Sequence, residues 1–197
     1  MLKDLAAYLQ RATPFSRFFC FLMLPGTFSA FLPDEVWLPL ALNPTTVFSP
    51  GAIYTLFTYW LITPGLFLWL NLCGTLVLAG IILEAVYRRR LLVALAAWGI
   101  IAGGVCYAVL EESPIMLVSG AMAAAAFTGA ALAVVVRNRQ SATMYGRLYV
   151  TAVVVTMLVT FDGQVQTMAR FMAGGAGALF AMVVPGFPGD DEDEEEA

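Results

Sequence analysis

The sequence predicts an all-α polytopic membrane protein, a bundle of six transmembrane helices with both termini in the cytoplasm. Of the 197 residues, 60% are hydrophobic and only 12% are charged, which is more apolar surface than a water-soluble core of this length buries. The mean hydropathy of +0.82 agrees. The apolar residues form six runs near the length of a membrane-spanning helix. Basic residues gather in alternate gaps between these runs, as the positive-inside rule requires.

The predicted spans are separated by charged gaps. Basic residues precede the first span and lie between the second and third and between the fourth and fifth, so only Arg170 of the ten basic residues falls on the opposite side. Adding or removing one span would scatter the arginines over both sides, so the charges favour six. The spans cover Phe15–Leu32, Leu66–Val86, Leu91–Leu110, Ile115–Val136, Leu148–Phe161 and Val165–Val184.

The remaining segments give the domain organisation. Residues 1–14 are predicted to be a cytoplasmic N-terminus, and residues 15–184 the membrane domain. Within it, residues 33–64 are rich in proline and aromatic residues, and we expect an outer loop at the membrane interface. Residues 185–197 carry seven of the fourteen acids. We expect a disordered acidic cytoplasmic tail, or one that recruits a basic cytoplasmic partner.

Composition also restricts the chemistry. The chain contains no histidine, which excludes a histidine-dependent enzyme, and we expect neither a cofactor nor a metal. Cys20, Cys73 and Cys106 each fall within an apolar run, and we interpret them as small apolar residues, not as a disulfide framework. Without its acidic tail the chain is slightly basic, which argues neither for nor against nucleic acid, and we expect no nucleic-acid partner.

Short motifs follow one another along the predicted spans. They are Phe48–Gly51 and Leu56–Tyr59 before the second span, Phe67–Asn71 and Gly80–Glu84 within it, Val118–Ala121 in the fourth and Arg170–Gly177 in the sixth. In order and spacing these segments resemble the rhomboid family of six-span intramembrane serine proteases. At the positions of the last four of these segments, that family has, in order, His-x-x-x-Asn, Gly-x-x-x-Glu, Gly-x-Ser-Gly, and a histidine followed by small residues. The resemblance covers residues 48–184 and implies a rhomboid-like bundle.

The resemblance assigns a role to four positions. Ser119 stands at the nucleophile and Asn71 at the oxyanion site. Phe67 and Arg170, or its neighbour Phe171, stand where rhomboids keep histidines. A serine hydroxyl needs an adjacent base, and a guanidinium cannot accept its proton. Phe67 also removes an oxyanion donor, a loss that typically costs about 100- to 1000-fold in rate. Leu117 fills space where the family motif has glycine. The site is therefore predicted to be relict.

Two further expectations concern packing. We expect Ser119 to lie close to Arg170, with its hydroxyl bonded to a backbone carbonyl one turn earlier in its own helix. The glycines of the sixth span are at helical spacing and predict close packing against the fourth span around Gly120 and Ala123. These glycines are Gly174, Gly175 and Gly177.

The resemblance implies a catalytically inactive membrane pseudoprotease. Its expected partners are membrane lipids and the transmembrane helices of client proteins, in a bacterial or archaeal plasma membrane. One alternative is an active intramembrane protease that uses Ser119 with an unorthodox base such as Asp162. Another is a small transporter or a structural membrane protein. The spans contain few ionisable groups beyond Glu84 and Arg170, which argues against transport.

Overall fold

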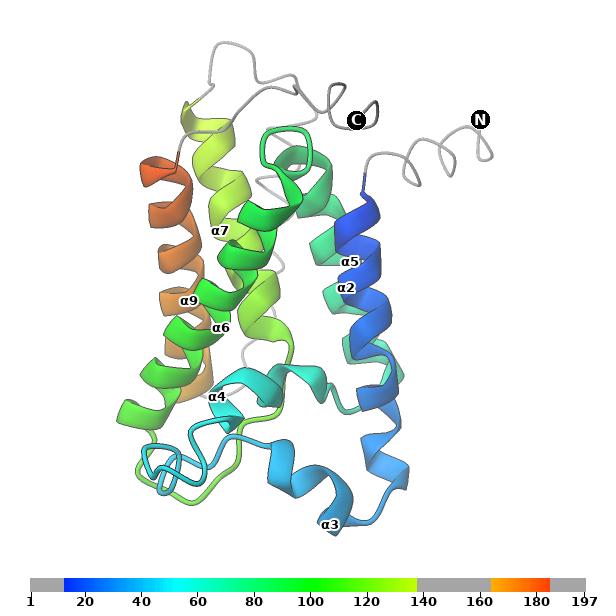
Figure 1. The fold of residues 1–197 in the computed structure, drawn as a ribbon, viewed down its shortest axis with the longest axis vertical. Coiled ribbons are helices and arrows are strands. Elements are labelled where there is room, and N and C mark those ends of the chain that lie inside the picture. The colour runs from blue at the N-terminus through cyan, green and yellow to red at the C-terminus, as the bar shows by residue number, and fades with distance from the viewer. Residues whose placement is uncertain (1–12, 138–163, 185–197) are drawn as a thin grey trace, which may run out of the picture.

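The computed structural model describes residues 13–137 and 164–184, and its fold there is an α-helical bundle. The long helices lie side by side along the longest axis of the molecule (Figure 1). They are α2 (Pro14–Met23), α5 (Leu66–Leu83), α6 (Arg89–Leu110), α7 (Ala121–Arg137) and α9 (Gln164–Val183). The predicted helical class is confirmed. The expected span Leu148–Phe161 and the acidic tail lie outside the described residues.

Two described helices are long and apolar enough to cross a membrane, judged by length and composition. They are α5, with 18 residues, and α6, with 22 residues. At a rise of about 1.5 Å per residue, α5 is about 27 Å long, close to the hydrocarbon thickness of about 30 Å. The third apolar helix, α7, is shorter, with 17 residues. A membrane location agrees with these helices, and the six-span arrangement stays a prediction.

Charge differs between the two ends of the bundle. Helices α2, α5, α6 and α7 alternate in direction, and α9 runs in the same direction as α7 (Figure 1). This order brings Arg17, Arg88–Arg90 and Arg137 to one end, here called the basic end. The opposite end, here called the acidic end, carries Asp34–Glu35 and Glu111–Glu112. Among the described residues, the charge separation predicted from sequence is therefore present in three dimensions.

The first apolar run is not one continuous α-helix. It divides into α2 and a 3-10 helix, η1 (Pro25–Phe31). Pro25 has no backbone N–H to donate to a carbonyl one turn earlier, so α2 ends here. The next residue, Gly26, packs on the outer loop, because a Cβ atom there would lie 1.9 Å from the Leu61 carbonyl oxygen. The prediction of a single span over Phe15–Leu32 is corrected accordingly.

The fourth apolar run also begins later than predicted. Helix α7 starts at Ala121, not at Ile115, because the preceding residues pair with the outer loop. Leu117 and Leu42 form an isolated antiparallel bridge, with N···O distances of 2.9 and 3.1 Å. The Tyr107 hydroxyl donates to the Ile115 carbonyl oxygen at 3.0 Å. These bonds use backbone groups that a longer helix would need for itself.

The outer loop is built from short helices, none long enough to cross a membrane. They are α3 (Asp34–Trp37), η2 (Leu38–Leu40), α4 (Thr55–Thr58) and η3 (Tyr59–Leu61). Tyr59 holds the loop on the bundle: its ring is fully buried, and its hydroxyl donates to the Ile100 carbonyl oxygen on α6 at 2.7 Å. Burial raises the pKa of Tyr59 well above its usual range.

Helices α7 and α9 approach to backbone contact. A Cβ atom on Gly129 would lie 1.9 Å from the Gly174 carbonyl oxygen, and one on Gly177 would lie 2.0 Å from the Ala126 carbonyl oxygen. Side chains at these glycines would force the helices apart. The prediction that small residues in the sixth apolar run pack closely on the fourth is confirmed for this pair of helices.

The register of this contact differs from the prediction. The close approach is made at Ala126 and Gly129, further along α7 than the predicted Gly120 and Ala123. Gly120 lies before the helix begins and packs elsewhere. A Cβ atom on Gly175 would meet nothing within 4 Å, so this third glycine takes no part in the contact.

Candidate functional site

The predicted nucleophile position lies in the turn that enters α7. Ser119 is 5% exposed, and its Oγ accepts a hydrogen bond from the Ala121 N–H at 3.1 Å. This bond to the N–H two residues on forms a local turn that leads into α7, whose first intrahelical bond is accepted by the Gly120 carbonyl oxygen. The expectation that Ser119 would bond a carbonyl one turn earlier in its own helix is wrong, because the helix begins after it.

The Ser119–Gly120 turn is enclosed by α2 and the end of the outer loop. A Cβ atom on Gly120 would lie 2.5 Å from Met23 Sδ and 3.4 Å from Thr63 Oγ1. Thr63 is fully buried, and its hydroxyl has no hydrogen-bond partner within the described part of the chain. The sequence did not single out Thr63, because a threonine between an aromatic segment and a proline carries no motif. The buried turn therefore contains two hydroxyl groups.

Phe67 and Asn71 lie on the face of α5 that points away from the packed core. Phe67, in the first turn of α5, is 90% exposed, and Asn71 one turn later is exposed as well. The opposite face carries Leu72 and Leu76 into the core. Within the described residues, no hydrogen bond joins the Asn71 amide to Ser119. Their assignment to a common relict site stays a prediction.

Phe67 and Asn71 belong to a stripe of α5 that we call the exposed α5 face. Its members recur at helical spacing, and most of them are apolar; they are Phe67, Leu70, Asn71, Gly74 and Leu78. A Cβ atom on Gly74 would meet nothing within 4 Å. Among the described residues this face is uncovered, and it presents one amide within an apolar surface.

Arg170 lies in the second turn of α9 and is half-buried. The first turns of α7 and α9 point toward the same acidic end of the bundle (Figure 1), so Ser119 and Arg170 both lie in that half of the molecule. Phe171, the neighbouring candidate for the lost histidine position, is 57% exposed. The guanidinium cannot act as the base for Ser119, because it stays protonated.

Glu84 and Glu111 do not supply a base either. Glu84 is bound to α2 at the basic end. Glu111 accepts hydrogen bonds from the Ser113 backbone and hydroxyl. Asp162, the alternative base considered from sequence, lies outside the described residues. Among the described groups, the Ser119 hydroxyl is bonded to a backbone N–H and to no group that could remove its proton.

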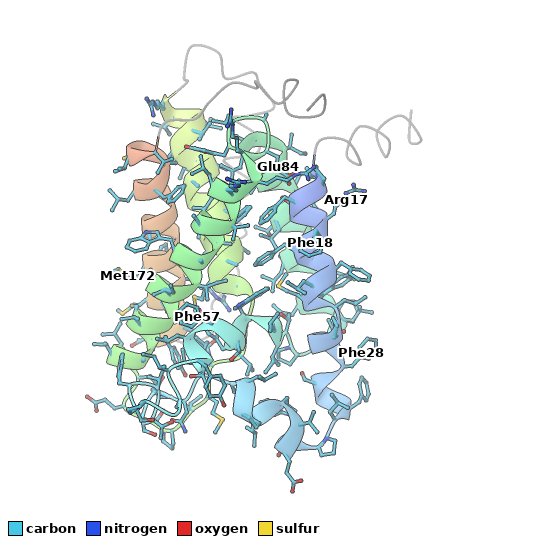
Figure 2. All side chains as sticks on the ribbon, in the orientation of Figure 1. Arg17, Phe18, Phe28, Phe57, Glu84 and Met172 are labelled. Atoms are coloured by element: carbon cyan, nitrogen blue, oxygen red, sulfur yellow. The ribbon has the colours of Figure 1, made fainter. Side chains whose placement is uncertain are left out.

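A second polar site joins α2 to α5 at the basic end. The Glu84 carboxylate accepts hydrogen bonds from the Phe15 N–H at 2.9 Å, the Ser16 N–H at 2.8 Å and the Ser16 hydroxyl at 2.5 Å. Figure 2 shows Glu84 beside the first turn of α2. Helix N-termini leave unpaired N–H groups and favour negative charge, so one helix caps another here. The motif Gly80–Glu84 identified this acid, but the sequence does not show that its carboxylate binds α2.

Comparison with family models, with curated proteins and with solved structures finds no match to this chain. The rhomboid resemblance therefore depends on the motifs alone.

Proposed function

We propose that this protein is a rhomboid-like membrane pseudoprotease, which binds transmembrane helices of other membrane proteins without cleaving them. The order of the motifs supports the family, and the absence of histidine from all 197 residues supports the loss of activity. Among the described residues, Ser119 is buried and no base is bonded to its hydroxyl, which supports this loss further. The Ser119 hydroxyl stabilises the turn that enters α7, a structural task that needs no chemistry.

The proposed topology has six spans with the basic end in the cytoplasm. Arginines are retained on the cytoplasmic side during insertion, and Arg88–Arg90 and Arg137 lie together at that end. The same arginines suit the anionic headgroups of a bacterial or archaeal plasma membrane. The outer loop and Ser119 then belong to the outer half of the bundle.

The exposed α5 face is the observation that most supports the binding of another transmembrane helix. An amide that faces hydrocarbon without a partner is unfavourable, and a neighbouring transmembrane helix with a polar group relieves it. Asn71 supplies this amide, and Gly74 leaves room for close approach three residues later. Helix α5 is about as long as the hydrocarbon is thick. The face therefore suits a transmembrane helix with a polar group near its centre.

Photocrosslinking in vesicles tests this proposal. The full chain, with benzoylphenylalanine in place of Phe67, is reconstituted in phosphatidylcholine vesicles with a labelled leucine-alanine transmembrane peptide that carries one central glutamine. The proposal predicts an adduct with this peptide and no cleavage of it. The adduct should fall at least about 10-fold in Asn71→Leu, as expected for loss of roughly 1.4 kcal/mol or more of interhelical hydrogen bonding.

A matched control uses Phe18, an exposed phenylalanine on α2 that lies outside the exposed α5 face. Benzoylphenylalanine at that position should give only the weak signal of random collision. Equal adducts from both positions, or adducts that persist in Asn71→Leu, would reject helix binding at this face. Release of a peptide fragment that stops in Ser119→Ala would identify an active protease instead.

A further inference from the structure

Two cysteines that are far apart in sequence meet where α2 packs on α5. Cys20 and Cys73 are separated by 53 positions, and the Cys20 thiol lies 3.9 Å from the Cys73 carbonyl oxygen. The Cys20 side chain therefore lies against the backbone of Cys73. Both are free thiols. The interpretation of these cysteines as unrelated small apolar residues missed this pairing, because it depends on which helices are neighbours.

The surroundings hold this pair in place. The Trp69 indole N–H donates to the Cys20 carbonyl oxygen at 3.0 Å, and one turn earlier on α2 the Ser16 hydroxyl is bound by Glu84 at 2.5 Å. Both contacts join α2 to α5. The helices thus keep Cys20 beside Cys73 without any covalent link.

The two thiols differ in access. Cys20 is buried, whereas Cys73 is half-buried, and Gly74 beside it borders open space. A small reagent that reaches the surface of α5 therefore meets Cys73 before it meets the buried Cys20. A reactive cysteine with a second thiol in contact is the arrangement that favours disulfide formation over further oxidation.

We propose that Cys20 and Cys73 are a redox-active pair, which hydrogen peroxide converts into a disulfide between α2 and α5. The Cys73 sulfur attacks the peroxide O–O bond, becomes a sulfenic acid, and one water leaves. The Cys20 sulfur then attacks the Cys73 sulfur, the S–S bond forms, and the sulfenic oxygen leaves as a second water. The two thiols lose two protons and two electrons, and the peroxide gains them to become two water molecules.

The disulfide would fix one helix of the bundle to its neighbour. The ring that it closes would include the whole outer loop. A disulfide that closes a longer ring lowers the conformational entropy of the unfolded chain more. Oxidation should therefore stabilise the bundle. This inference depends on the α2–α5 contact and is independent of the proposed binding of client helices.

Peroxide titration of the purified full chain in detergent tests the proposal. Intact mass should fall by about 2 Da, and accessible thiols in the denatured protein should fall from three to one. Peptide mapping without reductant should join Cys20 to Cys73, and dithiothreitol should restore all three thiols. The midpoint of thermal unfolding should rise by roughly 5 °C or more.

Single substitutions provide the controls. Cys106, on α6, is also half-buried but shares no hydrogen bond with either thiol, so Cys106→Ser should oxidise as the wild type does. Cys20→Ser should leave a sulfenic acid at position 73 that dimedone traps. Retention of three thiols in peroxide, disulfides formed only between molecules, or crosslinks through Cys106 would overturn the proposal.

Discussion

Substitution of Gly80 by alanine tests how α2 and α5 are held together. A Cβ atom on Gly80 would lie 2.1 Å from Ser16 Oγ, 2.8 Å from Ser16 Cβ and 3.0 Å from Glu84 Oε1. The serine cannot simply rotate away, because its hydroxyl is bound by the Glu84 carboxylate and its own Cβ atom is already too close. One helix must therefore move, and the hydrogen bonds to Glu84 must lengthen.

The magnitude follows from these bonds. A hydrogen bond to a charged group contributes about 1.5–3 kcal/mol, and disruption of the three bonds at Glu84 should cost about 2–4 kcal/mol in total after partial relaxation. Alanine gains about 1 kcal/mol over glycine in helix propensity. We expect Gly80→Ala to lower the free energy of unfolding by about 1–3 kcal/mol.

Gly74 is the matched control on the same helix. A Cβ atom there meets nothing within 4 Å, so Gly74→Ala should retain only the propensity gain and be neutral or slightly stabilising. Unfolding in detergent can be followed by tryptophan fluorescence, since Trp69 bonds α2 through the Cys20 carbonyl oxygen.

A second substitution tests whether contact with Ser16 causes the loss of stability in Gly80→Ala. Adding Ser16→Gly to Gly80→Ala removes both Ser16 atoms that the new methyl group would contact, so it should recover part of the loss despite the propensity cost of a second glycine. Equal stability of Gly80→Ala and Gly74→Ala, or further loss on adding Ser16→Gly, would refute the reasoning.

Three further predictions follow from single contacts. Tyr59→Phe should cost about 0.5–1.5 kcal/mol, because it removes the hydrogen bond that joins the outer loop to the Ile100 carbonyl oxygen. Since burial raises the pKa of Tyr59, wild-type stability should fall as pH rises above the unfolded pKa of about 10, and Tyr59→Phe should weaken this dependence in alkaline denaturation curves. Gly129→Ala should weaken the α7–α9 contact and lower the unfolding temperature, whereas Gly175→Ala, which borders open space, should not. A fluorophosphonate probe should leave Ser119 unlabelled in intact-mass spectra, because the hydroxyl lacks a base; labelling would contradict this.

The positions of the helices were largely predictable from sequence, because apolar runs and charged gaps determine them. Helix α6 and the predicted span Leu91–Leu110 end at the same residue, and α9 differs from Val165–Val184 by one residue at each end. The errors fall where tertiary contacts override hydropathy. Gly26 packs on the outer loop, and Leu117 pairs with Leu42, so apolar residues beside them leave the helical conformation.

The candidate site was predictable only in part. The motifs located Ser119 at the entrance to α7, but its bond to the Ala121 N–H depends on where the helix begins. The outward direction of Phe67 depends on the rotation of α5 about its axis, which a nearly uniform apolar helix does not encode. The partners of Glu84 and the pairing of Cys20 with Cys73 depend on which helices are adjacent.

The central proposal is that this bundle binds helices without cleaving them. The most direct test incubates the reconstituted wild-type protein and its Arg170→His variant with the glutamine-bearing transmembrane peptide and measures binding and cleavage in the same vesicles. We expect both proteins to bind the peptide and leave it intact, because Phe67 still lacks an oxyanion donor even when a histidine is restored. Cleavage by either protein that is abolished by Ser119→Ala would show that the site is catalytically competent, and the pseudoprotease assignment would be wrong.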